Sequence, residues 1–452
     1  MKIAIWIGLF FILCACNKKG FVLISGRIEN GDSVIAISTK DSIYTFYLDE
    51  DNFFSGRIPL KEGTYASLIP HSVDLFLVPG EDVEIYTNGQ NVQASLICKG
   101  VLGGINTYLK EQEMMNFVNK DDYLLNESEF VQRMQEIINE RVQLLEAKNF
   151  NKLFTESEKQ RICFSIGEKA IFYPIYHKQF TGDSLYRMGA ALRNFLTSFS
   201  LSAEDLFVTK AYRRFVLGYV YFQNGYDRKV DKNYSDELVD YILDNFQDKE
   251  IRNFLLSEVI YRYIWENNGL QGAEYMLNIF RRECSDLNKL DFINRMVEQW
   301  ERLQAGKPAP DFSLKTQEGG NVSLSNYRGF YLYLMVWASW CAPCKNELSY
   351  LMELEKRYAG RAIRFLTVSI DGLKNEMAWR ELLAQKRYGG LHALSEECGG
   401  FRSDYMVVSI PRFVLIGKDG QILNPDAPRP SGKMIETVLD SLLQNNERVM
   451  YD

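Results

Sequence analysis

Short runs in which hydrophobic and polar residues alternate, or in which β-branched and aromatic residues dominate, fill residues 21–100. This two-residue period is typical of β-strands with one buried face. Turn signals built from Asn, Pro and Gly separate the runs, which occupy residues 22–28, 42–48, 73–78 and 83–86. Because the strands are short and closely spaced, the segment is predicted to form a small N-terminal β-sandwich-like domain.

A helical period replaces the alternation over residues 105–303, where apolar residues recur three and four positions apart. One such stripe consists of Phe130, Met134, Ile137, Ile138, Val142 and Leu145. Aromatic residues are abundant in this segment, which predicts a central all-α helical region whose aromatic side chains fill the core. A substrate-docking or dimerisation surface is the alternative interpretation of the same aromatic residues.

The pattern changes a third time at residues 304–311, a predicted linker that contains two prolines and a glycine. Residues 306–452 then alternate apolar strands with helical stretches, such as the strand predicted at 330–337 and the helix predicted at 343–358. They also include a hairpin turn at residues 418–420. The order strand, helix, strand, helix, hairpin, helix predicts a C-terminal α/β domain with a mixed sheet. The chain is therefore predicted to be a multi-domain protein.

Residues 1–15 have the pattern of a targeting segment, because Lys2 is followed by an apolar run that is too short to span a bilayer. Residues 13–16 resemble a bacterial lipobox, since the small residue Ala15 directly precedes Cys16. The resemblance implies a lipoprotein signal peptide and a lipid on Cys16 that anchors the protein to a membrane. A secretory signal with incidental cysteines is the alternative. Either signal implies export to an oxidising compartment, where disulfides persist, and the lipid anchor implies a place in the cell envelope facing the periplasm, at the inner or the outer membrane.

Composition and charge narrow the possible functions. A hydrophobic content of 46% and a charged content of 25% are typical of a globular protein, and a net charge of −7 disfavours nucleic acid as a partner. The three histidines share no ligand spacing, so neither a metal nor a cofactor is expected. No oligomeric state is predicted. Four cysteines without a recognisable spacing are either buried thiols or members of structural disulfides: Cys98, Cys163, Cys284 and Cys398.

The motif that carries chemistry is Cys341-Ala342-Pro343-Cys344, which lies where an apolar strand is predicted to turn into a helix. A helix N-terminus offers unpaired N–H groups and the positive end of the helix dipole, and both stabilise the thiolate that acts as nucleophile. Cysteines three positions apart can close a disulfide, so one thiol can attack a mixed disulfide formed by the other. The alternatives are a structural disulfide and half of a zinc site, although the chain has no second such motif to complete a zinc site.

Several segments, in the same order, resemble the TlpA/ResA-like branch of the thioredoxin superfamily: residues 307–312, 340–344, 368–371 and 410–420. The resemblance implies a thioredoxin-like domain over residues 306–452 that exchanges thiols and disulfides with exported proteins. It also implies an unidentified electron donor in the membrane. Residues 21–100 resemble the β-rich domain that often precedes thioredoxin domains in envelope lipoproteins.

The resemblance assigns roles to individual residues. Cys341 is expected to attack and Cys344 to resolve, so that the two form a redox-active disulfide pair. Pro411 matches the cis-proline that faces the active site in this family. The expected substrate-binding residues are Trp340, Ala342, Pro343, Ile410 and Pro411.

Glu347 is the third expected catalytic residue, because this branch has a glutamate three residues after the second cysteine. On a helix it shares the face of Cys344 and is placed to accept a proton from that thiol. Met335 stands where thioredoxin has a buried aspartate, which favours this role. The alternative is an ordinary first-turn glutamate that points to water.

We interpret the chain as an envelope thiol–disulfide oxidoreductase that acts more as a reductase than as an oxidant. A peroxidase is disfavoured because the residues before Cys341 lack the pattern typical of peroxidatic enzymes. The alternative from a different class is a scaffold or ligand-binding lipoprotein whose N-terminal and helical domains carry the function.

Overall fold

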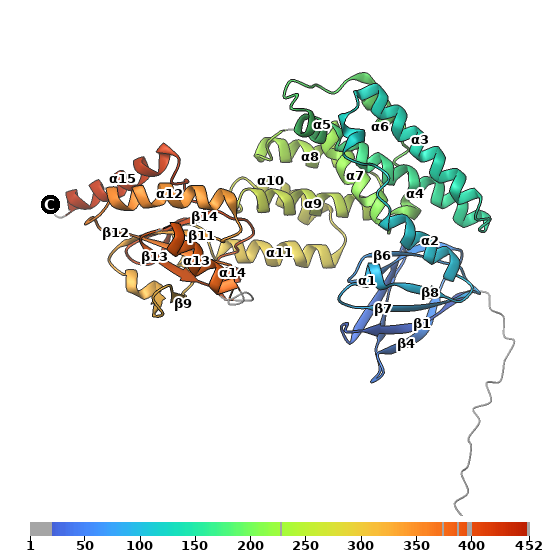
Figure 1. The fold of residues 1–452 in the computed structure, drawn as a ribbon, viewed down its shortest axis with the longest axis horizontal. Coiled ribbons are helices and arrows are strands. Elements are labelled where there is room, and N and C mark those ends of the chain that lie inside the picture. Colours follow the sequence, from blue (N-terminus) through green and yellow to red (C-terminus); the bar gives the residue numbers. More distant parts are fainter. Residues whose placement is uncertain (1–19, 227, 373–374, 387, 396–399, 450–452) are drawn as a thin grey trace, which may run out of the picture. The chain divides into compact units, whose positions relative to one another are not determined.

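The structure is a computed structural model that describes residues 20–226, 228–372, 375–386, 388–395 and 400–449 (Figure 1). The chain forms two compact units, Met1–Asp227 and Arg228–Asp452. The predicted signal peptide with Cys16, and also Cys398, lie outside the described residues. Within the described part of the chain, no helix is both long and apolar enough to cross a lipid bilayer.

Strands make up the N-terminal part of unit 1: β1 (Phe21–Glu29), β2 (Val34–Thr39), β3 (Ile43–Tyr47), β4 (Phe53–Pro59), β5 (Thr64–Ile69), β6 (Val73–Leu77), β7 (Asp82–Asn88) and β8 (Ile97–Lys99). They form two four-stranded sheets, in the orders β4-β1-β7-β8 and β3-β2-β5-β6. Burial alternates along β1 and β2, so each of these strands turns one row of apolar side chains inward. β1 pairs with β7 in parallel and with β4 antiparallel, so the first sheet is mixed.

Helices follow in the rest of unit 1: α1 (Val92–Ser95), α2 (Gly103–Met114), η1 (Asp121–Leu124), α3 (Glu127–Glu146), α4 (Lys152–Ile171), α5 (Tyr173–Thr181), α6 (Ala190–Thr197), η2 (Glu204–Leu206) and α7 (Lys210–Gln223). A capping box starts α3, because Asn126 and Glu129 each accept the backbone N–H of the other. The buried ring of Phe164 contacts the buried rings of Tyr212 and Phe215. These aromatic residues therefore fill the core of the helical region.

Unit 2 begins with four further helices, α8 (Lys232–Asn245), α9 (Lys249–Glu266), α10 (Glu274–Glu283) and α11 (Leu287–Glu301). The helices that the sequence predicts as one region are thus divided between the two units, and the predicted domain boundaries remain a prediction. At the end of α11, the buried ring of Trp300 lies 4.8 Å from the guanidinium carbon of Arg412. This contact fastens the last helix to the domain that follows it.

An α/β domain completes unit 2, with strands β9 (Ser313–Thr316), β10 (Asn321–Ser323), β11 (Tyr331–Trp337), β12 (Ile363–Ser369), β13 (Leu391–Leu394), β14 (Arg412–Ile416) and β15 (Ile422–Asn424). They form one seven-stranded sheet in the order β10-β9-β13-β12-β11-β14-β15. β11 is parallel to β12 and antiparallel to β14, so the sheet is mixed, as predicted. Trp337 is paired with Ser369, which brings the carboxyl ends of β11 and β12 together.

Helices pack on this sheet: η3 (Leu324–Tyr327), α12 (Ala342–Arg357), α13 (Glu376–Lys386), α14 (Phe401–Asp404) and α15 (Lys433–Val449). Figure 1 shows α12 and α15 running side by side along the sheet. The Tyr358 hydroxyl, at the end of α12, donates a hydrogen bond of 2.8 Å to Asp440 of α15. Alternate side chains of β11, Tyr333, Met335 and Trp337, are buried in the same core as apolar residues of α12. This core fixes the turn from β11 into α12.

Candidate active site

The cysteine motif lies at the start of α12, directly after a short loop that follows β11. Every residue from Leu332 to Trp337 is buried, which holds the end of the strand in place. Cys341 is the N-cap of α12, and its Sγ accepts the backbone N–H of Cys344 at 3.3 Å. Pro343 lies in the first turn of the helix, where an N–H would have no partner within the helix. The sulfur of Cys341 therefore faces the positive end of a helix of 16 residues.

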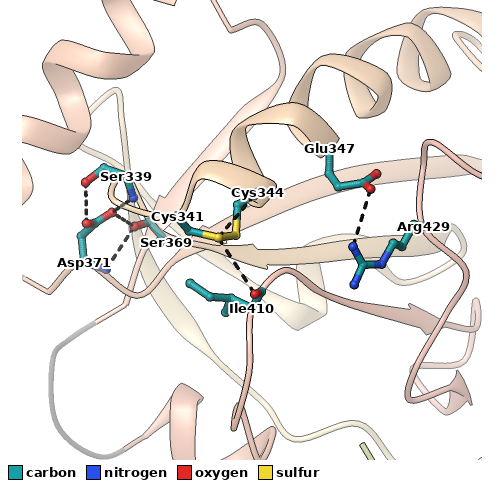
Figure 2. Close-up of a disulfide and its surroundings, with 8 residues drawn as sticks. All are labelled: Ser339, Cys341, Cys344, Glu347, Ser369, Asp371, Ile410 and Arg429. Atoms are coloured by element: carbon teal, nitrogen blue, oxygen red, sulfur yellow. Dashed lines mark hydrogen bonds and ion pairs between the residues drawn. A yellow bond between two sulfur atoms is a disulfide. The ribbon is translucent and has the colours of Figure 1, made fainter. Parts of the chain in front are cut away.

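Cys341 and Cys344 form a disulfide, with an S–S distance of 2.08 Å (Figure 2). Cys341 is 5% exposed and Cys344 is fully buried beneath it. The neighbouring Trp340 side chain is 67% exposed. Cys341 is thus the less buried cysteine of the pair, and it lies next to a large exposed apolar ring.

The loop before β14 lies across from the disulfide. The Ile410–Pro411 peptide bond is cis, as the resemblance implies. The carbonyl oxygen of Ile410 lies 4.0 Å from the Sγ of Cys341, and Figure 2 shows Ile410 facing the disulfide. The structure therefore brings the loop of Ile410 and Pro411 to the cysteine pair, although Ile410 lies 69 positions after Cys341 in the sequence.

Glu347 is 6% exposed, so it does not point to water. Its two carboxylate oxygens accept hydrogen bonds from Ser431, at 3.1 Å from the backbone N–H and 2.8 Å from the hydroxyl. The guanidinium of Arg429 lies 3.9 Å away. In Figure 2 the carboxylate is turned toward Arg429 rather than toward the disulfide. Glu347 thus ties α12 to the segment before α15, and its predicted catalytic role remains a prediction.

Asp371 is a buried carboxylate near the site to which the sequence assigned no role, although it lies in one of the segments that carry the resemblance. It accepts hydrogen bonds from the backbone N–H and the hydroxyl of Ser339, at 2.8 and 2.7 Å, and from the hydroxyl of Ser369 at 2.5 Å. Ser339 belongs to the loop that leads into Cys341 (Figure 2). The sequence signal for Asp371 is its position just beyond the apolar strand β12. The carboxyl end of β12 lies beside the carboxyl end of β11, which leads to the cysteine motif.

The other described cysteines lie apart from this chemistry. Cys98, Cys163 and Cys284 form no disulfide. Burial raises the pKa of each thiol, to about 12 for Cys98. They are therefore free thiols, buried at Cys98 and Cys284 and partly exposed at Cys163, and a raised pKa disfavours the reactive thiolate form. No group of three or more side chains suited to hold a metal occurs among the described residues.

Comparisons with known proteins point to the same segment. Residues 305–424 match the family model described as AhpC/TSA family. The thiol–disulfide oxidoreductase ResA of Bacillus thuringiensis subsp. konkukian is 26% identical over 143 residues, which are 31% of this chain and 80% of that protein. The thioredoxin-like protein YneN of Bacillus subtilis is 30% identical over 139 residues, which are 30% of this chain and 80% of YneN.

A solved structure of a thiol–disulfide oxidoreductase from Bacteroides fragilis is 27% identical, with a TM-score of 0.28, and covers 30% of this chain and all of that one. The matches of ResA and YneN extend over most of those proteins, and here the same third of the chain holds a disulfide at the start of a helix that packs on a mixed sheet. The chain therefore belongs to the thioredoxin superfamily, as an enzyme of its thiol–disulfide oxidoreductase group.

Proposed function

We propose that this protein reduces disulfides of exported proteins in the cell envelope, through the pair Cys341 and Cys344. The observation that supports this most strongly is the position of Cys341, whose sulfur accepts an N–H at the start of α12. A thiolate at this position is stabilised by the N–H group and by the helix dipole, and Cys341 is less buried than Cys344.

The reaction proceeds in two exchanges. The Cys341 thiolate attacks one sulfur of a substrate disulfide, a mixed disulfide forms, and the other substrate sulfur leaves as a thiolate. Cys344 then loses its proton and attacks the Cys341 sulfur, which closes the intramolecular disulfide and releases the second substrate thiolate. Two electrons pass from the pair to the substrate. A donor in the membrane, which is part of the proposal, returns two electrons to the pair.

Three features support binding of an extended substrate segment beside the pair. Trp340 offers an exposed apolar ring, and Ala342 and Pro343 separate the cysteines without adding a charge. The carbonyl of Ile410, next to Pro411, lies close enough to Cys341 to accept a backbone N–H from a substrate docked on that sulfur.

Glu347 is proposed as the proton acceptor for Cys344. Hydrogen bonds from Ser431 hold the Glu347 carboxylate in place.

The anchor is also part of the proposal. The lipobox-like residues 13–16 support a lipid on Cys16, which would hold the enzyme at a membrane with its thiol pair facing the periplasm. Such an anchor keeps the pair within reach of both exported substrates and a membrane donor.

Trapping of mixed disulfides tests the function. In Cys344→Ala the resolving thiol is absent, so Cys341 should remain bound to substrate proteins and be recovered as adducts that dithiothreitol releases. Cys341→Ala is the matched control, because it keeps one cysteine of the pair but removes the attacking sulfur. Wild-type protein should also reduce insulin disulfides in repeated turnovers. Equal adduct formation by the two variants, or no turnover by the wild type, would favour the scaffold or ligand-binding alternative.

The direction of electron flow is tested by equilibration with glutathione. A reductase pair should have a reduction potential closer to about −270 mV, the value of thioredoxin, than to the roughly −120 mV of a strong oxidant. A potential above about −180 mV would contradict the reductase assignment while leaving thiol–disulfide exchange intact.

A further inference from the structure

Unit 1, which does not contain the cysteine pair, has a cavity of about 350 Å³ between α2, α3, α4 and α7. Its lining carries an excess of positive charge. The basic residues outnumber the acidic ones by five to two, with Arg141, Arg161, Lys169, Lys210 and Arg214 against Glu113 and Glu168.

Both acidic residues are already paired with basic neighbours. A carboxylate oxygen of Glu113 lies 3.6 Å from the Nζ of Lys210. The carboxylate of Glu168 lies 3.2 Å from Lys169 and 4.0 Å from Arg214. These pairs leave no acidic lining residue to balance the two buried arginines.

Arg161 has a carboxylate of its own behind the cavity wall. Its Nε and Nη2 donate to Glu158 at 2.7 and 2.9 Å. Asp74 lies 3.7 Å from its Nη1, but burial raises the pKa of Asp74 to about 7. Neither Asp74 nor Glu158 lines the cavity, and the ion pairs of both are with Arg161.

Arg141 is the buried cation of the cavity that has no carboxylate in direct ion-pair contact, although Glu158 acts on it from a longer distance. It is 2% exposed, and no carboxylate oxygen of the described residues lies within 4.0 Å of its guanidinium. Its Nε donates to Gln112 at 3.3 Å and its Nη1 to the Ser165 hydroxyl at 3.4 Å, and both acceptors are neutral. The guanidinium also lies 4.2 Å from the centre of the Phe117 ring. Burial lowers the pKa of Arg141 to about 10, so it stays protonated at neutral pH.

A charge withdrawn from water and matched only by neutral acceptors destabilises its surroundings, and a bound anion in the adjoining cavity removes that cost. A guanidinium presents its N–H groups as a planar fork that fits two oxygens of a carboxylate or a phosphate. The volume is that of a small-molecule site rather than of a protein groove.

We propose that this cavity binds a small oxyanion, whose carboxylate or phosphate group is held by Arg141, with Lys210 and Arg214 at the more exposed rim. This proposal goes beyond the proposed function, because it gives unit 1 a ligand of its own. It requires no thiol chemistry, so a binding measurement tests it separately from reduction of disulfides.

Isothermal titration calorimetry of the full-length chain tests the proposal, with inorganic phosphate in one series and succinate in another, at matched ionic strength. At least one probe should bind saturably, and Arg141→Gln should weaken that binding by about tenfold or more. Arg133→Gln is the matched control, since it is the same substitution on the same helix but at a residue paired with Asp122 and Glu140. Its affinity should equal that of the wild type. Binding of one probe alone identifies the anionic group that the cavity prefers.

A second variant keeps the test decisive where Arg141→Gln does not fold. Arg214→Gln removes a cavity charge from a side chain that is 63% exposed, so the fold should not depend on it. It should weaken binding several-fold. The proposal is overturned if neither probe binds saturably, or if both cavity variants keep the wild-type affinity. It is also overturned if a control titration with sodium chloride gives the same binding curve as phosphate and succinate.

Discussion

Ser431 donates a hydrogen bond to each carboxylate oxygen of Glu347. The charge of Glu347 and its role as a tether can therefore be tested by different substitutions. In Glu347→Gln the amide oxygen can still accept one hydrogen bond from Ser431, but the side chain can no longer take a proton. We expect this variant to fold and to resolve mixed disulfides more slowly than wild type, with a smaller effect on the first attack by Cys341. Stopped-flow measurement of both steps between about pH 6 and pH 8 checks this, because thiols whose pKa is lowered by a helix N-terminus begin to ionise in that range.

Ser431→Ala is the control for the tether, because it removes one hydrogen bond and leaves the carboxylate. It should slow resolution less than Glu347→Gln does. The reverse order would mean that Glu347 acts only by holding the segment before α15 in place.

Asp371 acts on the site through the loop that carries Ser339. Asparagine at this position has one acceptor oxygen instead of two, so at least one of the three hydrogen bonds must be lost or reverse its direction. Asp371→Asn should lower the free energy of unfolding by roughly 1–3 kcal/mol. It should also slow alkylation of reduced Cys341 relative to wild type, because the loop that positions the N-cap is loosened.

Asp419→Asn is the matched control, since Asp419 accepts one backbone N–H in an exposed turn and asparagine can do the same. Urea unfolding and iodoacetamide labelling should give wild-type values for this control. Wild-type values for Asp371→Asn as well would remove its assigned role in positioning Cys341.

The residues of the site were predictable to different degrees for a physical reason. Cys341, Cys344 and Pro411 belong to short motifs of neighbouring residues, which can be recognised in the sequence alone. Asp371 and Ser431 act through hydrogen bonds between segments that are far apart in the chain, and no local pattern encodes such contacts. For Glu347 the helical spacing predicts the face it shares with Cys344, but its partner Ser431 lies 84 positions away.

At the scale of elements, long periodic segments were predictable, and several of the shortest strands were not. The run at 330–337 predicts β11 (Tyr331–Trp337), and the stretch at 343–358 predicts α12 (Ala342–Arg357) to within one residue at each end. The sequence does not predict β9, β10 or β13, which have only three or four residues and form by pairing with neighbours in the sheet. The parallel pairing of β1 with β7 also depends on chain topology rather than on local pattern.

The contact between β6 and α4 in unit 1 should make stability depend on pH. Asp74 of β6 faces Arg161 of α4, and burial raises the pKa of Asp74 from 3.8 to about 7. A carboxyl whose pKa is higher in the folded state binds a proton preferentially there, so its contribution to stability is lost as the pH rises from about 4 to about 7. In Asp74→Asn this contribution should be absent.

The measurement is the free energy of unfolding of both proteins by urea at several pH values. The difference between variant and wild type should shift in favour of the variant as the pH rises from about 4 to about 7, and should be constant above that range. A difference independent of pH would show that Asp74 is ionised in the folded protein throughout. Glu113 and Lys210, which also act on Asp74, are unchanged in the comparison.

At the scale of the whole molecule, the sequence predicts an exported, anchored enzyme, and the anchor can be tested directly. We expect the mature protein to begin at Cys16, to carry a lipid there and to partition with membranes. Cys16→Ser should release the protein or block its maturation, because one hydroxyl cannot replace a thioether-linked lipid. Cys14→Ser is the control, since the residue before Cys14 is a leucine rather than a small residue, and it should remain at the membrane.

Intact mass analysis of the purified protein decides the matter. A mass that corresponds to an unmodified Cys16 in a membrane-bound protein would contradict the anchor. The chemistry of Cys341 and Cys344 would be unaffected by that result.

The stacking of Arg412 on Trp300 has a consequence for truncation. Arg412 directly follows Pro411, is 1% exposed, and donates to the carbonyls of Met406 and Pro425 at 2.6 and 3.3 Å. A fragment that starts at residue 304 keeps both carbonyls but lacks Trp300, so water would reach one face of the guanidinium. The loop that carries the cis-proline would then lose the contact between Arg412 and Trp300 that holds it in the full chain. Rates measured on such a fragment would describe a less firmly buttressed enzyme than the full chain.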